Sequence, residues 1–423
     1  MEENQNPLRL KGLCRDNVGG RRPPGLPGRS SPTATSVSTA ATFFGNRKIS
    51  QRLWKSGSLF AGNSKRCWNH EGMYMTMKLE QLIAIDLGNG STSYKAGNGK
   101  EGEFPSLVAS YTGTGLGGAL SKDAFQTKNG RKYLVGDDCR EEGARSRSTD
   151  SSFYKSDEIR VLFLKVLKDV GIKNPVIVTG LPTEFVNTHS ADFERDLKAW
   201  AREDGYQPEM VKVLPQFAGP WFDPDLLDEE GKPIDTTAMS KGRWGIIDIG
   251  YGTIDGGGFN NGRVSDTRYG ESSGVSDIHK DIYTSLSNPE QLNDLIAKKG
   301  AKLPKGFTLD SQINEYTMDV WLREGHFMWR GTKIDMEPIS LPACTNFADQ
   351  VIPRFIKHLW GSTDFLSGMV AAGGGATILR SHMKRHITCP IYCAKDPDKS
   401  VVRGYYRYMI LQYFKEHAVV RQG

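Results

Sequence analysis

The run LIAIDLGNGSTSYK, residues 82–95, is the part of the chain around which the rest is organised. Its apolar stretch ends in an acid, a turn of glycine and asparagine follows, and a second strand carries a lysine. The run GIIDIGYGTID, residues 245–255, repeats this pattern with an acid in the same place. Short apolar runs separated by glycine predict buried β-hairpins. One such hairpin is weak evidence, but two indicate two similar halves that close on one ligand.

The residue types in the two turns favour a polyphosphate as that ligand. Glycine lets backbone N–H groups approach an anion closely, and a concave set of such amides binds phosphate. Asp86 and Asp248 each stand near the end of the first strand of a hairpin, where a carboxylate can hold a hydrated divalent cation. The two stretches therefore predict a polyphosphate site with a divalent cation.

The composition is that of a soluble globular protein. The chain has 423 residues, of which 38% are hydrophobic and 25% charged, which suits roughly two to four domains. No apolar run approaches the roughly 18 residues that a membrane span needs, so we expect a cytoplasmic protein with no membrane partner.

The six cysteines show no paired CxxC spacing, so neither a zinc site nor a disulfide framework is supported. Cys389 and Cys393 could ligate a metal, but two cysteines near a strand end in a reducing compartment are the favoured interpretation.

The net charge of +6 is unevenly placed. Residues 1–76 contain 12 basic and 4 acidic residues, whereas the remainder is nearly neutral, with 43 basic and 45 acidic residues. The globular part therefore gives no reason to expect nucleic-acid binding over its surface. Direct contact with nucleic acid is expected, if anywhere, through residues 1–76.

Residues 1–76 differ in kind from the rest, because the Pro/Gly/Ser/Arg-rich segment at 21–32 has no hydrophobic period. Such a segment cannot bury enough apolar area to offset its chain entropy. Four interpretations remain open: a disordered basic arm that contacts DNA or a partner, a transit peptide, an extension without a role, or a mis-assigned start. We favour the last, with Met73, Met75 or Met77 as the true start, because the strand pattern begins directly after Met77.

Hydrophobic periodicity predicts the remaining elements. Apolar residues recur at helical spacing over residues 157–170, and Gly171 ends that helix. The glycine-rich run at 111–118 is expected to be a mobile loop, and residues 288–340 are more polar, with one helix around 312–324. Other strands are expected at 104–108, 131–136, 175–182, 212–216 and 368–372, and other helices from 183 to about 202, from 275 to about 286, and at 344–360, 377–386 and 400–414.

A third glycine-rich element follows the strand at 368–372, where Gly373, Gly374 and Gly375 precede a predicted helix. A strand, a glycine turn and a helix place backbone amides and the positive end of the helix at a ligand. Alone this is a weak signal, because a tight strand–helix turn needs glycine anyway. As the third such element of one chain it strengthens the prediction of a phosphate-containing ligand.

These elements together resemble the actin-like ATPase superfamily over roughly residues 78–415. The resemblance rests on the two hairpins, the connecting strand VTGLP at 178–182, the glycine turn at 373–376 and a returning C-terminal helix. Within the superfamily, the chain looks most like the plasmid-segregation actins, the ParM/StbA group. The segments that carry this closer likeness are TGLP-T-EF at 179–185, GESSGV at 270–275 and GYY at 404–406.

The resemblance implies an α/β protein with the actin-like fold, in which two similar, ribonuclease H-like α/β domains close on a nucleotide cleft. It places domain I at residues 77–214, completed by the C-terminal helix at 396–423. Domain II is expected at 215–395, with an outer subdomain at about 275–340.

The resemblance also assigns the phosphate contacts. Lys95 would be the phosphate-facing lysine of the first hairpin, although an exposed strand lysine is the plainer alternative. Tyr251 takes a position that a small residue usually fills, so its side chain must point away from the phosphate or alter the pocket. The turn residues expected at the phosphates are Gly88, Asn89, Gly90 and Ser91 on one side and Gly250, Tyr251, Gly252 and Thr253 on the other.

Asp86 and Asp248 would hold Mg²⁺, through water, and take part in catalysis. Gln216 stands where the resemblance places the residue that orients the attacking water; an amide cannot act as a carboxylate base, so water positioning is its expected role. An ordinary loop amide is the alternative. Asp255 ranks below Asp248 as a ligand. Gly373, Gly374 and Gly375 would line the adenosine pocket, and the preference for ATP over GTP follows from the family alone.

The leading hypothesis is an ATPase that binds Mg-ATP, assembles head to tail into a homopolymer and hydrolyses ATP to time disassembly. In the plasmid group such filaments move plasmid DNA through a DNA-bound adaptor protein. One alternative is a soluble ATP-dependent enzyme of the same superfamily, of the sugar kinase or exopolyphosphatase type. Another is a nucleotide-binding scaffold without enzymatic activity, for which the basic arm is the only support.

Overall fold

The computed structural model describes residues 66–68, 74–76, 78–111, 124–142, 153–298, 300–310, 313 and 315–413. The chain divides into residues 1–49 and residues 50–423, and the second unit holds every element described below. Most of the predicted N-terminal arm and most of the predicted loop at 111–118 lie outside the described residues. Within the arm, β1 (Arg66–Trp68) and β2 (Tyr74–Thr76) pair as antiparallel strands.

The first large sheet is built around the first predicted hairpin. β3 (Leu82–Leu87) pairs antiparallel with β4 (Ser91–Ala96), which pairs with β5 (Glu101–Pro105). On the other side of β3 lie two parallel neighbours, β9 (Val176–Leu181) and β10 (Met210–Pro215). The strand order is therefore β10-β9-β3-β4-β5.

The second large sheet repeats this plan around the second predicted hairpin. β12 (Arg243–Ile249), β13 (Ile254–Asn260) and β14 (Arg263–Glu271) form an antiparallel meander. β17 (Gly368–Ala372) and then β18 (Ile391–Ala394) add in parallel on the other side of β12. The order β18-β17-β12-β13-β14 matches that of the first sheet, and β11 (Leu226–Leu227) extends its edge. The predicted α/β fold with two similar halves is confirmed.

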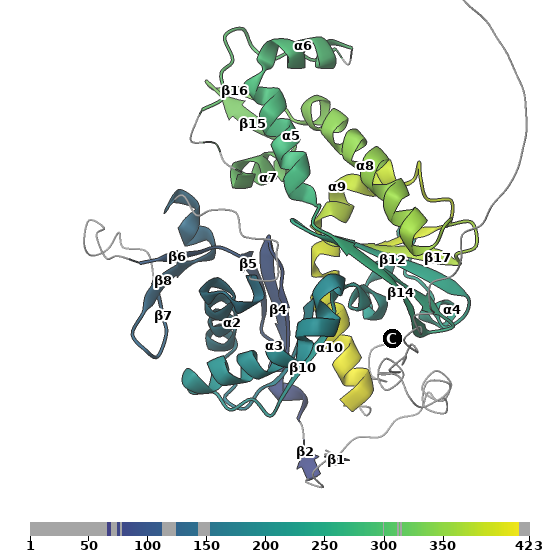
Figure 1. The fold of residues 1–423 in the computed structure, drawn as a ribbon. Coiled ribbons are helices and arrows are strands. Elements are labelled where there is room, and N and C mark those ends of the chain that lie inside the picture. Colours follow the sequence, from purple (N-terminus) through teal and green to yellow (C-terminus); the bar gives the residue numbers. More distant parts are fainter. Residues whose placement is uncertain are drawn as a thin grey trace, which may run out of the picture. The chain divides into compact units, whose positions relative to one another are not determined.

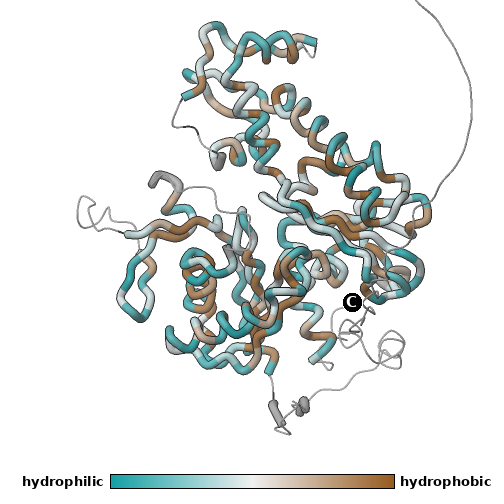
Figure 2. Tube along the Cα trace, in the orientation of Figure 1, coloured by the Kyte–Doolittle hydropathy of each residue, from teal (hydrophilic) through white to brown (hydrophobic). Residues whose placement is uncertain are grey.

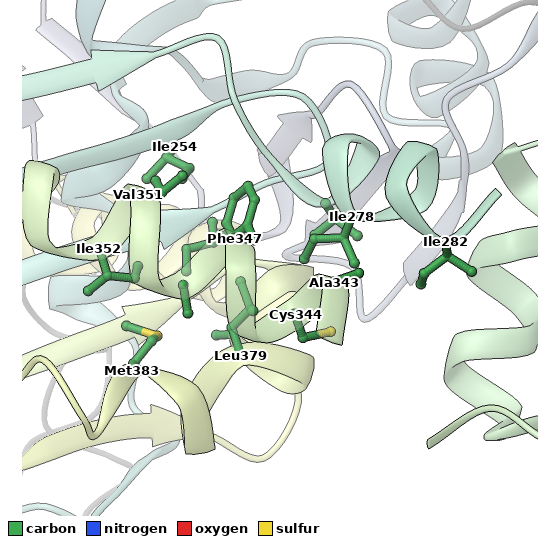
Figure 3. Packing of buried hydrophobic residues seen from close by; sticks show 14 of the residues in the cluster. Ile254, Ile278, Ile282, Ala343, Cys344, Phe347, Val351, Ile352, Leu379 and Met383 are labelled. Carbon is green, nitrogen blue, oxygen red and sulfur yellow. The ribbon is translucent and has the colours of Figure 1, made fainter. Parts of the chain in front are cut away.

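Helices pack on each sheet and bury its apolar face (Figures 1 and 2). In the first half, α2 (Asp157–Val170), α3 (Thr183–Glu203) and α10 (Ser400–Tyr413) contact the strands. The predicted helix at 157–170 is confirmed, with Ser156 as its N-cap and Gly171 in the left-handed conformation at its end. In the second half, α8 (Glu337–Leu359) and α9 (Gly374–Met383) pack on the sheet, and α5 (Val275–Ser287) packs on α8; the buried side chains of these helices belong to one core (Figure 3).

The C-terminal helix α10 returns to the first sheet, where it contacts β3, β4 and β9. Gly404 lies so close to the backbone of Gly219 that any larger residue would collide with it. Arg403 forms two hydrogen bonds, of 2.9 and 2.8 Å, with the carboxylate of Asp223. The helix is thereby fixed to the segment that follows β10.

Each half also carries a smaller outer part. In the first half, β6 (Val108–Ser110), β8 (Lys132–Val135) and β7 (Phe125–Gln126) form a three-stranded antiparallel sheet. In the second half, α6 (Pro289–Ala297), α7 (Glu315–Glu324) and the hairpin of β15 (His326–Trp329) and β16 (Thr332–Asp335) lie beside α5. The remaining short helix, α4 (Thr236–Met239), precedes β12. None of the helices in the described ranges combines the length and the apolar character needed to cross a bilayer.

Several predicted boundaries were wrong. α8 begins at Glu337 rather than at 344, because Pro338 occupies the first turn, where the missing N–H is no loss. Gly374 and Gly375 belong to α9, so only Gly373 forms the turn that the sequence assigned to 373–376. The prediction of one helix in 288–340 missed α6 and the β15–β16 hairpin.

Candidate nucleotide site

The first hairpin turn is a tight concave loop. Asp86 on β3 pairs with Ser93 on β4, and residues 88–90 connect the strands. A β-carbon on Gly88 would stand 2.8 Å from the carbonyl oxygen of Ser91, so only glycine fits there. Asn89 Oδ1 is buried and has no hydrogen-bond partner in the described part of the chain. A buried amide without a partner is costly, which makes the turn a place suited to a polar ligand.

The second hairpin turn has the same plan with one more residue. Asp248 on β12 pairs with Asp255 on β13, and the N–H of Gly250 donates to the carbonyl of Thr253 at 2.8 Å. Asp248 is buried at 5% exposure and Asp255 at 2%. Two carboxylates are therefore removed from water at the base of this turn.

The two turns touch each other through Tyr251. A β-carbon on Gly90 would stand 2.7 Å from Cβ of Tyr251, and the Tyr251 ring lies 5.6 Å from the ring of the buried His279 on α5. Tyr251, which occupies a position usually filled by a small residue, thus contacts both the first turn and α5. Both turns belong to one site.

Burial and mutual repulsion raise the pKa values of the acids at this site. The pKa of Asp86 rises to about 7, mainly because it is buried and also because of the charge of Glu103. The pKa of Asp248 rises well above its usual range through burial and then through the charges of Asp86 and Asp255. The carboxylates near the ends of β3 and β12 are therefore close enough to repel each other, although they belong to different sheets. A bound cation would relieve this repulsion.

Gln216 stands beside this pair of acids. It begins the short 3-10 helix that follows β10, and its Nε2 donates to Asp86 Oδ1 at 3.2 Å. This contact lowers the pKa of Asp86 and opposes the effect of its burial. The structure thus brings Gln216 together with the acid of the first hairpin.

The glycines after β17 reach the second hairpin from another direction. Gly373 has a φ of 79°, and a β-carbon there would stand 2.5 Å from Asp248 Oδ1. A β-carbon on Gly375 would collide with the side chain of Ile249. These glycines let the start of α9 approach the base of the second turn, which places the positive end of that helix near the acids.

Lys95 is the predicted site residue that lies apart from the turns. It pairs with Ala84 and Glu101 across the sheet, well along β4 from residues 88–90. Its Nζ forms an ion pair with Glu101 and lies 5.8 Å from the ring centroid of Tyr406 on α10. The structure therefore gives the lysine a partner at the sheet edge rather than at the phosphate turn.

Two neighbours of the site were not predicted in these positions. Asp255 Oδ1 accepts a hydrogen bond from the backbone N–H of Thr183 at 2.6 Å, which ties the second hairpin to the start of α3. Arg323 on α7 reaches within 3.4 Å of a β-carbon placed on Gly374. The sequence marked Asp255 only as a secondary acid, and Arg323 carried no signal because α7 lies in a polar segment without a motif.

The donor set suits Mg²⁺ held together with phosphates. No cluster of three or more His, Cys, Asp or Glu side chains that could hold a metal occurs among the described residues. Mg²⁺ commonly takes one or two carboxylates and completes its shell with water and substrate phosphates, which Asp86 and Asp248 could provide. Cys389 and Cys393 are free and buried, and burial raises the pKa of Cys389 to about 11.

Two family models match the chain, one to each half. The model of the N-terminal domain of actin-like proteins matches residues 84–216, and that of the C-terminal domain of archaeal MreB-like actin homologues matches residues 246–385. No curated protein matches the chain by sequence. The matched regions contain both hairpins and Gln216, and the chain belongs to the actin-like proteins.

Solved structures agree in fold. A 15-stranded ParM filament from Clostridium botulinum is 21% identical, covering 77% of this chain and 98% of that one, with a TM-score of 0.55. An archaeal actin homologue in complex with ADP is 17% identical over 78% of this chain and 99% of that one, with a TM-score of 0.53. A MamK double helical filament is 16% identical over 77% and 98%, with a TM-score of 0.51. The predicted resemblance to the actin-like superfamily is confirmed, and ParM is among the structural matches.

Proposed function

We propose that the chain is a filament-forming ATPase that binds Mg-ATP between its two α/β halves. The contact between the two hairpin turns is the observation that carries this proposal, and burial together with the charge of Asp86 raises the pKa of Asp248 at that contact. Two acids that repel each other beside two glycine turns suit a ligand that brings both a cation and phosphates. The structural likeness to an archaeal actin homologue in complex with ADP supports an adenine nucleotide.

In this proposal the backbone amides of residues 88–91 and 250–253 hold the β- and γ-phosphates. Asn89 has a buried amide oxygen without a partner, and its side chain would complete the first turn once a hydrated ligand is bound. The start of α9 with Gly373, Gly374 and Gly375 would border the adenosine. Lys95, which pairs with Glu101, is left out of the proposed phosphate contacts.

Asp86 and Asp248 would hold Mg²⁺ through water, and the ion, when bound, would neutralise phosphate charge. Gln216 donates its Nε2–H to Asp86, which leaves its Oε1 available to accept a hydrogen bond from a water. The amide would thus orient the attacking water without taking its proton. Closure of the two turns through Tyr251 would keep other water from the phosphates.

Assembly into a homopolymer is part of the proposal, and the filaments among the structural matches support it. A DNA-bound adaptor protein and a role in plasmid segregation, in the cytoplasm, complete the proposal. A plasmid-retention assay in cells that lack the gene would test this last step, and unchanged retention would contradict it.

The test of the whole proposal is one sample of the full chain to which Mg-ATP is added. Light scattering should rise and then decay as phosphate is released. Phosphate release without scattering would instead favour a soluble enzyme of the same superfamily. If light scattering does not rise and no phosphate is released, even at protein concentrations well above the micromolar range, the proposal is contradicted.

A further inference from the structure

One buried hydroxyl close to the candidate site is not used by the nucleotide contacts proposed above. Tyr405 on α10 is completely buried, and its Oη makes no hydrogen bond within the part of the chain that the structure describes. A buried hydroxyl without a partner is costly, and native proteins keep few of them. Its surroundings therefore indicate what it could bind.

The hydroxyl occupies the space that a side chain at position 180 would fill. A β-carbon on Gly180 of β9 would collide with Tyr405 Oη, and it would stand 3.0 Å from the carbonyl oxygen of Leu214. Leu214 on β10 is the residue that pairs with Gly180. The hydroxyl therefore lies against the carboxyl ends of β9 and β10, and it fits there because position 180 has no side chain.

Asp86 lies on the same face of the first sheet, one strand away. β3 and β9 run parallel and pair at Ala84 and Val178. Asp86 and Gly180 each follow two residues later, so they face the same side of the sheet as that pair. The collision of a β-carbon on Gly180 with Tyr405 Oη shows that α10 packs on this side. The hydroxyl is therefore a neighbour of the acid at the end of β3.

Gln216 approaches the same acid from the end of β10. Its Nε2 donates to Asp86 Oδ1 at 3.2 Å, and α10 contacts the short 3-10 helix that Gln216 begins. The pKa of the phenol on α10 rises well above its usual range through burial and then through the charges of Asp86, Asp248 and Asp255. All three acids at the bases of the two hairpin turns therefore act on this hydroxyl.

α10 gives the hydroxyl a fixed support. Tyr405 directly follows Gly404, which lies against the backbone of Gly219, and a β-carbon on Gly219 would stand 3.2 Å from Cε1 of the Tyr405 ring. The residue before Gly404, Arg403, is held by two hydrogen bonds to a buried carboxylate. A side chain held by packing and by its neighbours can orient a group at a site more precisely than a mobile one.

We propose that Tyr405 is a positioning residue, whose O–H donates a hydrogen bond to the carboxylate of Asp86 when Mg-ATP is bound. This inference rests on the proposed function, in which Asp86 helps to hold the hydrated cation. A carboxylate accepts several hydrogen bonds, and Gln216 uses Oδ1, which leaves Oδ2 for the phenol. Two donors from different elements then fix the orientation of the acid, as outer partners of metal-binding side chains do.

The test compares Tyr405→Phe with Tyr408→Phe in the full chain. Tyr405→Phe keeps the ring and removes only the unpartnered hydroxyl, so the Tm of the nucleotide-free protein should equal or exceed that of the wild type. When Mg²⁺ is titrated at fixed ATP, the half-maximal rise in Tm should need at least tenfold more Mg²⁺, as the loss of a hydrogen bond to a charged group implies. The rise in Tm with ATP and EDTA should be that of the wild type, because the hydroxyl acts through the acid that holds the cation.

Tyr408 is the matched control, because it is also buried on α10 but packs on Phe222, 5.2 Å from ring to ring. Tyr408→Phe should need as much Mg²⁺ as the wild type. A double variant tests whether the hydroxyl acts through Asp86: adding Tyr405→Phe to Asp86→Asn should leave the Mg²⁺ dependence of the Tm as it is in Asp86→Asn alone.

Three results would overturn this inference alone. These are a wild-type Mg²⁺ requirement in Tyr405→Phe, a further loss when Tyr405→Phe is added to Asp86→Asn, and a Tm of Tyr405→Phe that falls equally with and without Mg-ATP, which would show a purely structural role. A wild-type chain whose Tm does not respond to Mg-ATP would instead overturn the proposed function.

Discussion

Gly90 in the first hairpin and Tyr251 in the second lie in direct contact, although they belong to different sheets. A β-carbon on Gly90 would stand 2.7 Å from Cβ of Tyr251 and 3.2 Å from its Cγ. Tyr251 is in turn 5.6 Å, ring to ring, from His279 on α5. The closeness of the two turns therefore depends on the absence of a side chain at position 90.

Gly90→Ala should force the turns apart and impair catalysis more than folding. The clash involves Cβ of Tyr251, which cannot move independently of the backbone, and a misplacement of about 1 Å can cost about 100-fold in rate. We expect a loss of that order in phosphate release. The double variant Gly90→Ala/Tyr251→Gly removes the Tyr251 atoms with which the new β-carbon collides and should recover much of the activity. Normal activity of Gly90→Ala would show that the turns separate in the active state.

The contribution of Asp86 to the stability of the nucleotide-free protein should fall as pH rises from about 4 to about 7. The pKa of Asp86 rises from 3.8 to about 7 in the folded chain, so the folded state keeps a proton that the unfolded state releases. The contribution of this group to stability is complete below pH 3.8 and is lost as pH rises through the folded pKa. Asp255, whose pKa rises to about 6, acts in the same direction.

Asp86→Asn should therefore stabilise the nucleotide-free protein at pH 8 while it abolishes hydrolysis. We expect a gain on the order of 2 kcal/mol in the free energy of unfolding, less than the full pKa shift implies because the side chain is not fully buried. Urea unfolding at pH 5 and pH 8 measures it, with Asp266→Asn, an exposed aspartate on β14, as the control. An equal effect of Asp86→Asn at both pH values would contradict the argument.

The hairpins could be predicted because a buried strand, a glycine turn and an acid are local patterns. Their contact could not, because Gly90 and Tyr251 meet only through the packing of two sheets. The bond between Gln216 and Asp86 is likewise a tertiary contact, and only family resemblance pointed to Gln216. α8 was predicted to begin at residue 344, yet the helix begins at Glu337 and continues through Pro342.

For Lys95, the role that the resemblance implies and the contacts in the structure differ, and the phosphate-facing role stays a prediction. The sequence placed it at the phosphates from its position after the turn, but the pleat of β4 and the nearby Glu101 decide where its Nζ lies. Asp255 shows the reverse. The sequence ranked Asp255 low as a metal ligand, but in the structure its carboxylate accepts a hydrogen bond from the backbone N–H of Thr183.

Asp255→Ala should destabilise the protein by about 1–3 kcal/mol, because it leaves the Thr183 N–H without its acceptor in a buried place. Asp255→Asn keeps an oxygen for that hydrogen bond and removes a buried charge, so its stability at pH 8 should equal or exceed that of the wild type. Thermal or urea unfolding of both variants measures the difference. Equal losses in the two variants would show that the hydrogen bond is not the stabilising contact.

Lys95→Met should change the affinity for ATP less than about threefold, because the lysine pairs with Glu101 instead of the turn. Asn89→Ala, in the turn itself, should weaken ATP binding about tenfold, as the loss of one hydrogen bond to a charged group does. Equilibrium titration with a fluorescent ATP analogue compares the two. A larger loss for Lys95→Met would restore the phosphate-facing role that the sequence suggested.

Gln216→Ala should slow hydrolysis without weakening nucleotide binding. A positioned group of this kind contributes about 100-fold or more, and its loss also frees Asp86 Oδ1 from the 3.2 Å hydrogen bond. Filaments of the variant should therefore assemble with Mg-ATP and persist, because the phosphate release that times their decay is slow.

Gln216→Glu separates the two roles of the amide. A carboxylate there places a second negative charge beside Asp86 and raises its pKa further, so the rate should recover only as pH rises above 7, whereas Gln216→Ala should show no such recovery. Rapid decay of Gln216→Ala filaments would show that another group orients the water.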